Sequence, residues 1–523
     1  MIPEEKYYIK IGRAGELKKS KERIIYRLLE MLPGFLIWLT FAAMLFFSWQ
    51  RPVWAAVFII AFSLYFFLKT IHFTIHLTAA YKKMRENIET DWREKLDKIS
   101  KIPSQIKAKS WKEIYHLVVL PMYKEEYEIV KNTMDAILNS DYQKERIIVV
   151  LGIEERAGQS ARTTAERIQR EYGKFFFRFL ITLHPAKLPG EISGKGSNET
   201  WAGREVKNKI IDVEKIPYQN IIVSCFDIDT RVYPKYFLCL TYYYLVAKNP
   251  LRASFQPIPL YLNNLWDVPF FSRLVSSMNV FWQMMQQQRP EKEITYSSHA
   301  MGFFPLAEMD FWQTNVVSED AGIFWKAFLF YDGDYKVVPL HYPVTMDAVS
   351  SRNFLKTALN QYRQQRRWAW GSEGIPYMLF GCLKNKNISL KKKLSYSFLI
   401  IEGFWAWATN AILLFCLGWL PLIFNEENFS FSSSLLAHNL PYITRNLMTL
   451  AMAGLFACIV INTLLITRLE KLSWRQKIFL TAQWLFFPFG LIIFGSFPAI
   501  DAQTRLMLAK YMGFWTTPKL RKA

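Results

Sequence analysis

The sequence predicts an α/β domain, built on a mostly parallel sheet and inserted between membrane-spanning helices. Apolar runs long enough to cross a bilayer occur near both ends of the chain. The stretch between them alternates strand-like and helix-like segments. The 523 residues are 51% hydrophobic and 16% aromatic, which excludes a disordered or low-complexity chain.

The net charge indicates which partners to expect. Lys and Arg outnumber Asp and Glu by 65 to 44, a formal charge of +21. Such an excess favours phosphate-bearing partners: nucleotides, an anionic membrane face or nucleic acid. Because the basic residues cluster beside the apolar runs, we expect membrane lipids and no nucleic acid. The dispersed cysteines predict reduced thiols, with neither a disulfide framework nor a zinc site; they are Cys225, Cys239, Cys382, Cys416 and Cys458.

A basic N-terminal segment, residues 1–30, precedes a predicted transmembrane hairpin over residues 31–73. Residues 31–49 and 53–73 would each cross a hydrocarbon core of about 30 Å as a helix. Lys and Arg residues on both flanks place both ends of the hairpin in the cytoplasm. Early acidic residues and the lack of a small-residue cleavage site argue against a secretory signal.

Residues 77–393 are expected to form the soluble, cytoplasmic domain, with an amphipathic interfacial segment near 373–384. Apolar runs without alternation are typical of parallel strands that are covered on both faces. Ligands of such sheets bind at the carboxyl ends of the strands. The predicted strands are 116–120, 146–153, 176–183 and 220–226.

Residues 395–500 turn apolar again and precede a basic tail, residues 501–523. Three crossings after a cytoplasmic domain would put this tail outside, yet its Lys and Arg residues favour the cytoplasm. Pro488 and Pro498 would break the last span into a re-entrant element. The sequence leaves five or six crossings open, with candidate spans at 398–420, 450–466 and 479–497.

Two acidic motifs stand next to predicted elements. Asp227 and Asp229 follow the strand at 220–226, where paired carboxylates could hold a divalent cation against a diphosphate. Taken alone, such a pair is more often a solvated turn. Glu319 and Asp320 begin a predicted helix, where they could simply cap it. Alternatively, Asp320 could act as a general base.

Two further motifs are cationic. Gln364, Arg367 and Trp368 lie just before the interfacial segment, where such residues usually anchor a protein to the bilayer. Arg367 could instead bind a departing diphosphate, and the indole of Trp368 could stack on a sugar. Lys195 and Asn198 lie in a Gly-rich loop before a predicted helix, which is either a turn or a phosphate-binding loop.

In this order, with apolar spans on both sides, the motifs resemble those of the membrane-embedded family 2 inverting glycosyltransferases of the cellulose synthase and hyaluronan synthase type. The resemblance covers nearly the whole chain. It implies a cytoplasmic GT-A-like domain. The family's Asp-any-Asp, Thr-Glu-Asp and Gln-any-any-Arg-Trp strings are matched by Asp227 and Asp229, by Ser318, Glu319 and Asp320, and by Gln364, Arg367 and Trp368.

The resemblance also implies roles for these residues. Asp229 would bind Mg²⁺ or Mn²⁺, Asp320 would be the catalytic base, and Glu319 would be its neighbour in the acceptor site. The nucleotide would be bound by Tyr123, Glu125, Glu154, Glu155, Lys195, Asn198 and Asp227, and the diphosphate and acceptor by Gln364, Arg367, Trp368, Ser298 and His299.

The sequence departs from the family pattern in two places. Lys124 stands where asparagine is common, and Glu154 and Glu155 replace the usual aspartates after the second strand. The loop 296–302 lacks the usual Phe-Cys-Gly string and has His299 in its middle. These changes leave the identity of the donor base and of the acceptor open.

The expected activity is that of a metal-dependent inverting hexosyltransferase in the plasma (inner) membrane. A UDP-sugar or GDP-sugar would donate a sugar to a polysaccharide acceptor, with processive synthesis and export as an extension of this reaction. Two alternatives stay open: transfer of a single sugar to a lipid acceptor, and a catalytically inactive protein that binds nucleotides and assembles partners.

Overall fold

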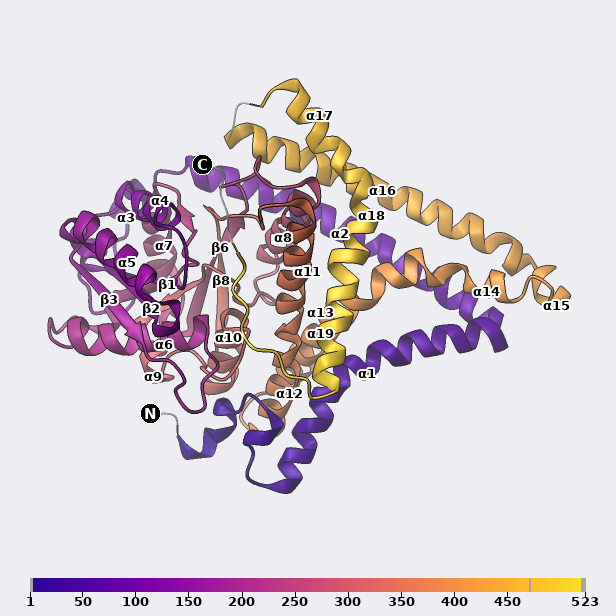
Figure 1. Cartoon of the computed structure of the whole chain (residues 1–523), viewed down its shortest axis with the longest axis horizontal. Helices are drawn as coiled ribbons and strands as arrows, with labels where there is room; N and C mark the ends of the chain where they lie inside the picture. Colours follow the sequence, from indigo (N-terminus) through magenta and orange to yellow (C-terminus); the bar gives the residue numbers. More distant parts are fainter. Residues whose placement is uncertain (1–2, 470–471, 519–523) are drawn as a thin grey trace.

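The computed structural model describes residues 3–469 and 472–518. An α/β domain forms one side of the molecule, and long apolar helices extend away from it on the other (Figure 1). Four of the basic residues that bear on membrane topology lie outside the described residues: Lys471, Lys519, Arg521 and Lys522.

An eight-stranded sheet lies at the centre of the domain, in the order β3-β2-β1-β4-β7-β6-β8-β5. The first four strands pair in parallel, as the sequence predicts. They are β1 (Tyr115–Met122), β2 (Ile147–Glu154), β3 (Arg178–His184) and β4 (Ile221–Cys225).

The other four strands make the sheet mixed. β6 and β8 pair in parallel, whereas β7 is antiparallel to both β4 and β6, and β5 is antiparallel to β8. The α/β fold class is therefore confirmed, with a parallel majority of strand pairs. These strands are β5 (Arg231–Val232), β6 (Ala253–Leu260), β7 (Ala300–Gly302) and β8 (Lys336–Thr345).

Helices cover both faces of the sheet and create two cores. Leu117 and Val119 of β1 are buried in one core, and Val118 and Leu120 in the other. Burial on both faces explains why the strand is an unbroken apolar run. The helices around the sheet are α3 (Trp92–Asp97), α4 (Tyr127–Leu138), α5 (Gln159–Tyr172), α6 (Lys195–Val206), α7 (Tyr236–Val246), α8 (Phe270–Gln287), α9 (Phe303–Glu308), α10 (Glu319–Phe330), α11 (Phe354–Ala369) and α12 (Gly374–Lys384).

The segment predicted to be interfacial corresponds to α12. Its apolar side chains are buried in the first core, where Gly381 leaves room for Leu329 of α10. Most of α12 is therefore part of the domain core, and contact of this segment with a membrane surface stays a prediction.

Five helical segments among the described residues are long and apolar enough to cross a membrane. Each predicted span falls mainly within one of them, which supports a membrane protein. Two short helices, α14 (Leu420–Phe424) and α15 (Phe429–Ser432), lie at the ends of the long helices far from the sheet (Figure 1). The five segments are α1 (Ser20–Gln50), α2 (Pro52–Glu89), α13 (Leu390–Phe415), α16 (Leu435–Leu469) and the run Trp474–Met507.

The fifth segment differs from the other four. It is divided into α17 (Trp474–Ala482), α18 (Phe487–Leu491) and α19 (Phe497–Met507), with Pro488 and Pro498 in the first turns of α18 and α19. In Figure 1, α18 and α19 run crosswise to α2 and α16, beside the α/β domain. Residues 508–518 then return along the domain, so the described part of the basic tail lies on the domain side.

Candidate active site

Asp227 and Asp229 follow the carboxyl end of β4, but they differ in exposure. The carboxylate of Asp229 is fully buried, and its Oδ2 accepts a hydrogen bond from the amide of Asp347 at 2.8 Å. The side chain of Asp227 is 28% exposed, and its Oδ2 accepts from the hydroxyl of Ser297 at 2.8 Å. Asp229 is thus fixed by the fold, while Asp227 is partly exposed at the carboxyl edge of the sheet, where sheets of this kind have their ligand crevice.

Lys195, the first residue of α6, connects the acidic motifs. Its ammonium donates to both carboxylate oxygens of Asp320, at 2.8 and 2.9 Å, and lies 3.0 Å from Oδ1 of Asp227. Glu319 and Glu199 lie 3.6 and 3.7 Å from the same nitrogen. Burial lowers the pKa of Lys195, but these carboxylates outweigh burial and raise the pKa well above its usual range. The site therefore holds a buried positive charge among four acids.

Glu319 and Asp320 occupy the first turn of α10, and Glu373 positions the chain that leads into it. Oε1 of Glu373 accepts from the amides of Val317 and Ser318, both at 2.8 Å. Burial and the nearby charge of Asp320 raise the pKa of Glu319 to about 8. Near neutral pH, Glu319 is therefore mostly protonated. Asp320 is 22% exposed and reaches the crevice.

His299 and Ser298 lie next to the acidic cluster. Nδ1 of His299 is 3.6 Å from Oδ1 of Asp320 and 3.0 Å from the carbonyl of Tyr296, to which a protonated Nδ1 donates. Burial lowers the pKa of His299. Ser298 has a φ of 66°, and its hydroxyl lies 3.2 Å from that of Thr230. The loop thus places an uncharged imidazole beside Asp320.

Arg367 and Trp368 on α11 lie near the acidic cluster. The ring of Trp368 lies 6.4 Å from that of the buried Tyr261. Burial, followed by the charges of Asp227 and Asp229, raises the pKa of Tyr261, so this phenol lies near both carboxylates. The charge of Arg367 lowers the pKa of Glu319, so the Arg367 guanidinium also lies near the acidic cluster.

The side chain of Gln364 contacts its own helix. Its side chain is buried, and its Oε1 accepts from Nε2 of Gln361 at 3.2 Å. This bond joins two residues of α11 and holds the amide within the helix surface. Contact of Gln364 with a diphosphate or an acceptor stays a prediction.

A second group of predicted residues meets at the adjacent carboxyl ends of β1 and β2. Oε2 of Glu125 accepts from the amide of Tyr123 at 2.7 Å. Glu154 accepts two hydrogen bonds from Arg156, at 2.6 and 2.9 Å, and the same guanidinium lies 4.7 Å from the ring of Tyr123. Sequence reasoning overlooked Arg156, although it stands only two residues beyond Glu154.

Two predicted nucleotide-binding residues make contacts within the fold instead. Glu155 is exposed, and its Oε2 accepts from the amide of Ala186 at 2.9 Å. Asn198 is buried, and its Nδ2 donates to the carbonyl of Gly152 at 2.8 Å, which holds α6 against β2. The structure gives Asn198 a clear role in positioning Lys195, and nucleotide binding by either residue stays a prediction.

Glu199 is another residue that sequence reasoning overlooked. It is fully buried, and neither carboxylate oxygen has a hydrogen-bond partner among the described residues. Burial raises the pKa of Glu199 well above its usual range. It follows Lys195 by four residues in a predicted helix, a spacing that places both on one face and could have revealed it. Tyr261 and Asp347 carry no comparable signal in the sequence.

The tail after α19 packs against two parts of the candidate site, the Lys195 loop and α11. A Cβ on Gly194 would lie only 2.5 Å from the ring of Phe514, and the guanidinium of Arg367 lies 5.0 Å from the same ring. The hydroxyl of Tyr511 donates to the buried Glu30 at 2.8 Å. Residues 508–518 are therefore held against the Lys195 loop and α11, a role that the sequence analysis did not foresee.

Asp227 and Asp229 are candidates for holding a divalent cation together with substrate oxygens, and metal binding stays a prediction. Among the described residues no group of three His, Cys, Asp or Glu side chains has the geometry of a metal centre. Mg²⁺ and Mn²⁺ need only one or two carboxylates when phosphate oxygens and water supply the other ligands. Asp227 and Asp229 offer such oxygens, and the contact of Asp227 with Lys195 shows that this position attracts a cation.

No protein-family model and no curated protein matches this sequence. Solved structures with a similar arrangement include the mannosyltransferase PcManGT from Pyrobaculum calidifontis in complex with GDP-Man and Mn²⁺. It is 13% identical, with 77% of this chain and 98% of that chain covered and a TM-score of 0.40. Residues 1–349 of S. aureus TarS in complex with UDP-GlcNAc are 10% identical, with 76% and 93% covered and a TM-score of 0.33. Similarity at this level carries no inference about activity.

Proposed function

We propose that this chain is a membrane-bound inverting glycosyltransferase. It moves a sugar from a nucleotide-diphosphate sugar to a glycan acceptor at the cytoplasmic face of the plasma membrane. The observation that carries the proposal is the position of the Lys195 ammonium, 3.0 Å from Asp227 and 2.8 Å from Asp320. A carboxylate suited to the donor and one suited to act as a base thus share one crevice.

The donor side of the crevice has groups that could bind a negatively charged diphosphate. Asp227 and Asp229 would hold Mg²⁺ or Mn²⁺, which neutralises charge on the departing diphosphate when it is bound. Arg367 offers forked donors to the same group, and Trp368 offers a flat apolar face to a sugar ring. Tyr123, together with the residues at the ends of β1 and β2, would line the nucleoside pocket.

Asp320 provides the base for a single displacement. It takes the proton of an acceptor hydroxyl, whose oxygen forms a bond to the anomeric carbon. The bond from that carbon to the diphosphate oxygen breaks on the opposite side, and the configuration inverts. Glu319, which is mostly protonated near neutral pH, can donate a hydrogen bond to the acceptor, and His299 limits the movement of the Asp320 carboxylate.

The long helices support a topology with four crossings. α1, α2, α13 and α16 would cross the bilayer, and α17 to α19 would lie along its cytoplasmic surface. An even number of crossings returns the basic tail to the side of the domain, as the positive-inside rule requires. The same helices could form the wall of a path for a growing polysaccharide. A single transfer to a lipid acceptor is the alternative outcome.

A donor screen tests this proposal. The full chain, purified in detergent, is incubated with a panel of UDP-sugars and GDP-sugars in the presence of Mg²⁺ or Mn²⁺, and release of nucleoside diphosphate is measured. We expect one donor to be used, with the label entering a high-molecular-weight product. A single extractable glycolipid would instead establish the lipid-acceptor alternative. Nucleotide binding without turnover of any donor would favour the inactive assembly protein.

A further inference from the structure

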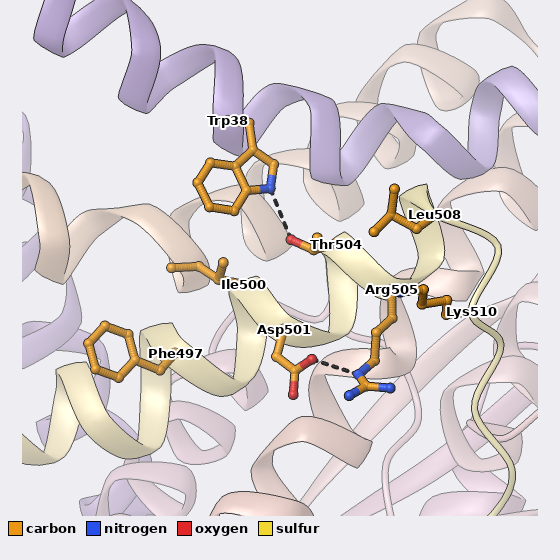
Figure 2. Close-up of a pocket in the computed structure, with 8 residues that line it drawn as sticks. All are labelled: Trp38, Phe497, Ile500, Asp501, Thr504, Arg505, Leu508 and Lys510. Atoms are coloured by element: carbon orange, nitrogen blue, oxygen red, sulfur yellow. Dashed lines mark hydrogen bonds and ion pairs between the residues drawn. The ribbon is translucent and has the colours of Figure 1, made fainter.

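A second hollow lies between α1 and α19, outside the crevice (Figure 2). Its volume is about 380 Å³, within the range of small-molecule sites. One part of its wall is apolar and the other is charged. The apolar part includes Trp38, Phe497 and Ile500, and the charged part includes Asp501, Arg505 and Lys510.

The apolar part faces away from the protein interior. Trp38 is 47% exposed and Phe497 is 48% exposed, and both belong to segments apolar enough to lie in a membrane. Nε1 of Trp38 donates to the hydroxyl of Thr504 at 3.0 Å, which fixes the indole against α19 (Figure 2). An indole with a polar contact at one end and apolar surface at the other is typical of the membrane interface.

The charged part has more cations than acids. Asp501 accepts from Arg366 at 2.8 Å and from Arg505 at 2.6 Å, so both carboxylate oxygens already face guanidinium groups. The amide of Lys510 donates to the carbonyl of Arg505 at 2.8 Å, and this bond brings the two basic residues together. Among the described residues the ammonium of Lys510 has no ion-pair partner. The lining of the hollow thus holds two cationic side chains and one carboxylate.

The position of α19 indicates where the hollow would lie relative to the headgroups and acyl chains of a bilayer. α19 contacts α1 and also α11 of the α/β domain, and it lies where the domain meets the long apolar helices (Figure 1). Lys510 begins the return of the tail toward the domain, whereas Phe497 lies at the opposite end of α19. With α19 along the membrane surface, its charged groups would lie near headgroup level, and Trp38 on the crossing helix α1 would extend the apolar wall toward the acyl chains.

We propose that this hollow binds an anionic glycerophospholipid. Its phosphate would pair with Arg505 and Lys510, and one acyl chain would lie against Trp38 and Phe497. A lipid is favoured over a free phosphate because the charged part continues directly into exposed apolar surface. Since Asp501 also bonds to Arg366, the neighbour of Arg367, the lipid would brace the helix that carries crevice residues. The inference does not depend on glycosyl transfer.

Lipid binding to the full chain tests the proposal directly. The protein is delipidated in detergent and titrated with phosphatidylglycerol or phosphatidylcholine, and bound lipid is counted by native mass spectrometry. The double variant Arg505→Gln with Lys510→Gln leaves Asp501 paired with Arg366. A matched control, Arg475→Gln with Lys477→Gln, removes the same charge from exposed residues of α17, outside the hollow.

We expect wild type and the control to bind phosphatidylglycerol about tenfold more tightly than phosphatidylcholine, because the cations of the hollow attract a headgroup with a net negative charge. The pocket variant should lose this preference, and Trp38→Ala should weaken the binding of both lipids. Equal preference in the pocket variant and the control would overturn the proposal. So would competition by millimolar inorganic phosphate alone, which would identify a phosphate site and not a lipid site.

Discussion

Lys195 donates hydrogen bonds to both carboxylate oxygens of Asp320, at 2.8 and 2.9 Å. The two residues begin different helices, α6 and α10, so this contact joins the loop after β3 to the proposed catalytic base. The lysine is 8% exposed and also contacts Asp227. One buried ammonium therefore balances the charge of Asp227 on the proposed donor side and of Asp320, the proposed base.

Replacement of this ammonium should damage both the fold and the activity. Lys195→Met leaves the carboxylates of Asp227 and Asp320 without their counter-charge, and since both are partly exposed the cost should lie below the about 3–5 kcal/mol of a fully buried ion pair. We expect a clearly lower midpoint of thermal unfolding in detergent and little glycosyl transfer. Lys107→Met, at an exposed lysine, is the control. A midpoint equal to that of wild type would show that Lys195 is not what holds the acidic cluster together.

Asp229→Asn tests the metal-binding role separately from the fold. The asparagine retains an oxygen that can accept from the amide of Asp347 but removes a charged metal ligand. Because a metal supplies several kcal/mol to such a reaction, transfer should fall on the order of 100-fold. The electron paramagnetic resonance signal of free Mn²⁺ in the presence of donor measures binding. Unchanged Mn²⁺ affinity in the variant would remove Asp229 from the metal site.

The raised pKa of Glu319 predicts a pH-dependent stability. Its pKa is about 8 in the folded protein and lies near the usual glutamate value of 4.5 in the unfolded chain. Between these values the folded state retains a proton that the unfolded state has lost, so the free energy of unfolding falls as pH rises. This group contributes a slope of up to about 1.4 kcal/mol per pH unit.

Glu319→Gln removes that slope, while Glu199, whose pKa is also raised, retains its own contribution. Thermal unfolding followed by tryptophan fluorescence at pH 5.5, 6.5 and 7.5 provides the comparison. The stability of the variant relative to wild type should increase at each step. Glu166→Gln, at an exposed glutamate, should show a constant difference. A constant difference for Glu319→Gln as well would contradict the raised pKa.

Gly194→Ala should release the tail from the crevice. The added Cβ would lie 2.5 Å from the ring of Phe514, a contact that forces the ring to move. We expect trypsin to cleave after Lys510 several-fold faster, and donor-dependent transfer to fall. Gly15→Ala is the control, since nothing lies within 4 Å of that position. Cleavage at the wild-type rate would show that the tail is not held by this contact.

The sequence predicts β1 to β4 well and misses β5 to β8. β1 is recognisable because Leu117 and Val118 are buried in different cores, which requires an unbroken apolar run. β6 contains Pro257 and Pro259, and proline inside a segment argues against a central strand. The sheet accommodates them by an irregular register between Gln256 and Ile258, which no local pattern predicts.

In the candidate site, too, some residues could be predicted from the sequence and others could not. Asp227, Glu319 and Asp320 are found from motif order alone, and the structure brings them together around Lys195. The central position of Lys195 depends on how α6 packs, so the sequence showed only a basic loop. Contacts of Phe514 depend on the path of the chain after α19, which is fixed by tertiary contacts and not by residue spacing.

The most direct test is the rate of sugar transfer by Asp320→Asn, measured beside donor binding in the same preparation. The variant loses the proton acceptor but retains an oxygen near Lys195, so donor affinity should stay within a few-fold of wild type. Transfer should fall by about 10²–10⁴. Asp334→Asn, at an exposed aspartate of the same domain, should transfer normally. Transfer by Asp320→Asn at the wild-type rate would contradict the assignment of the base and, with it, the proposed mechanism.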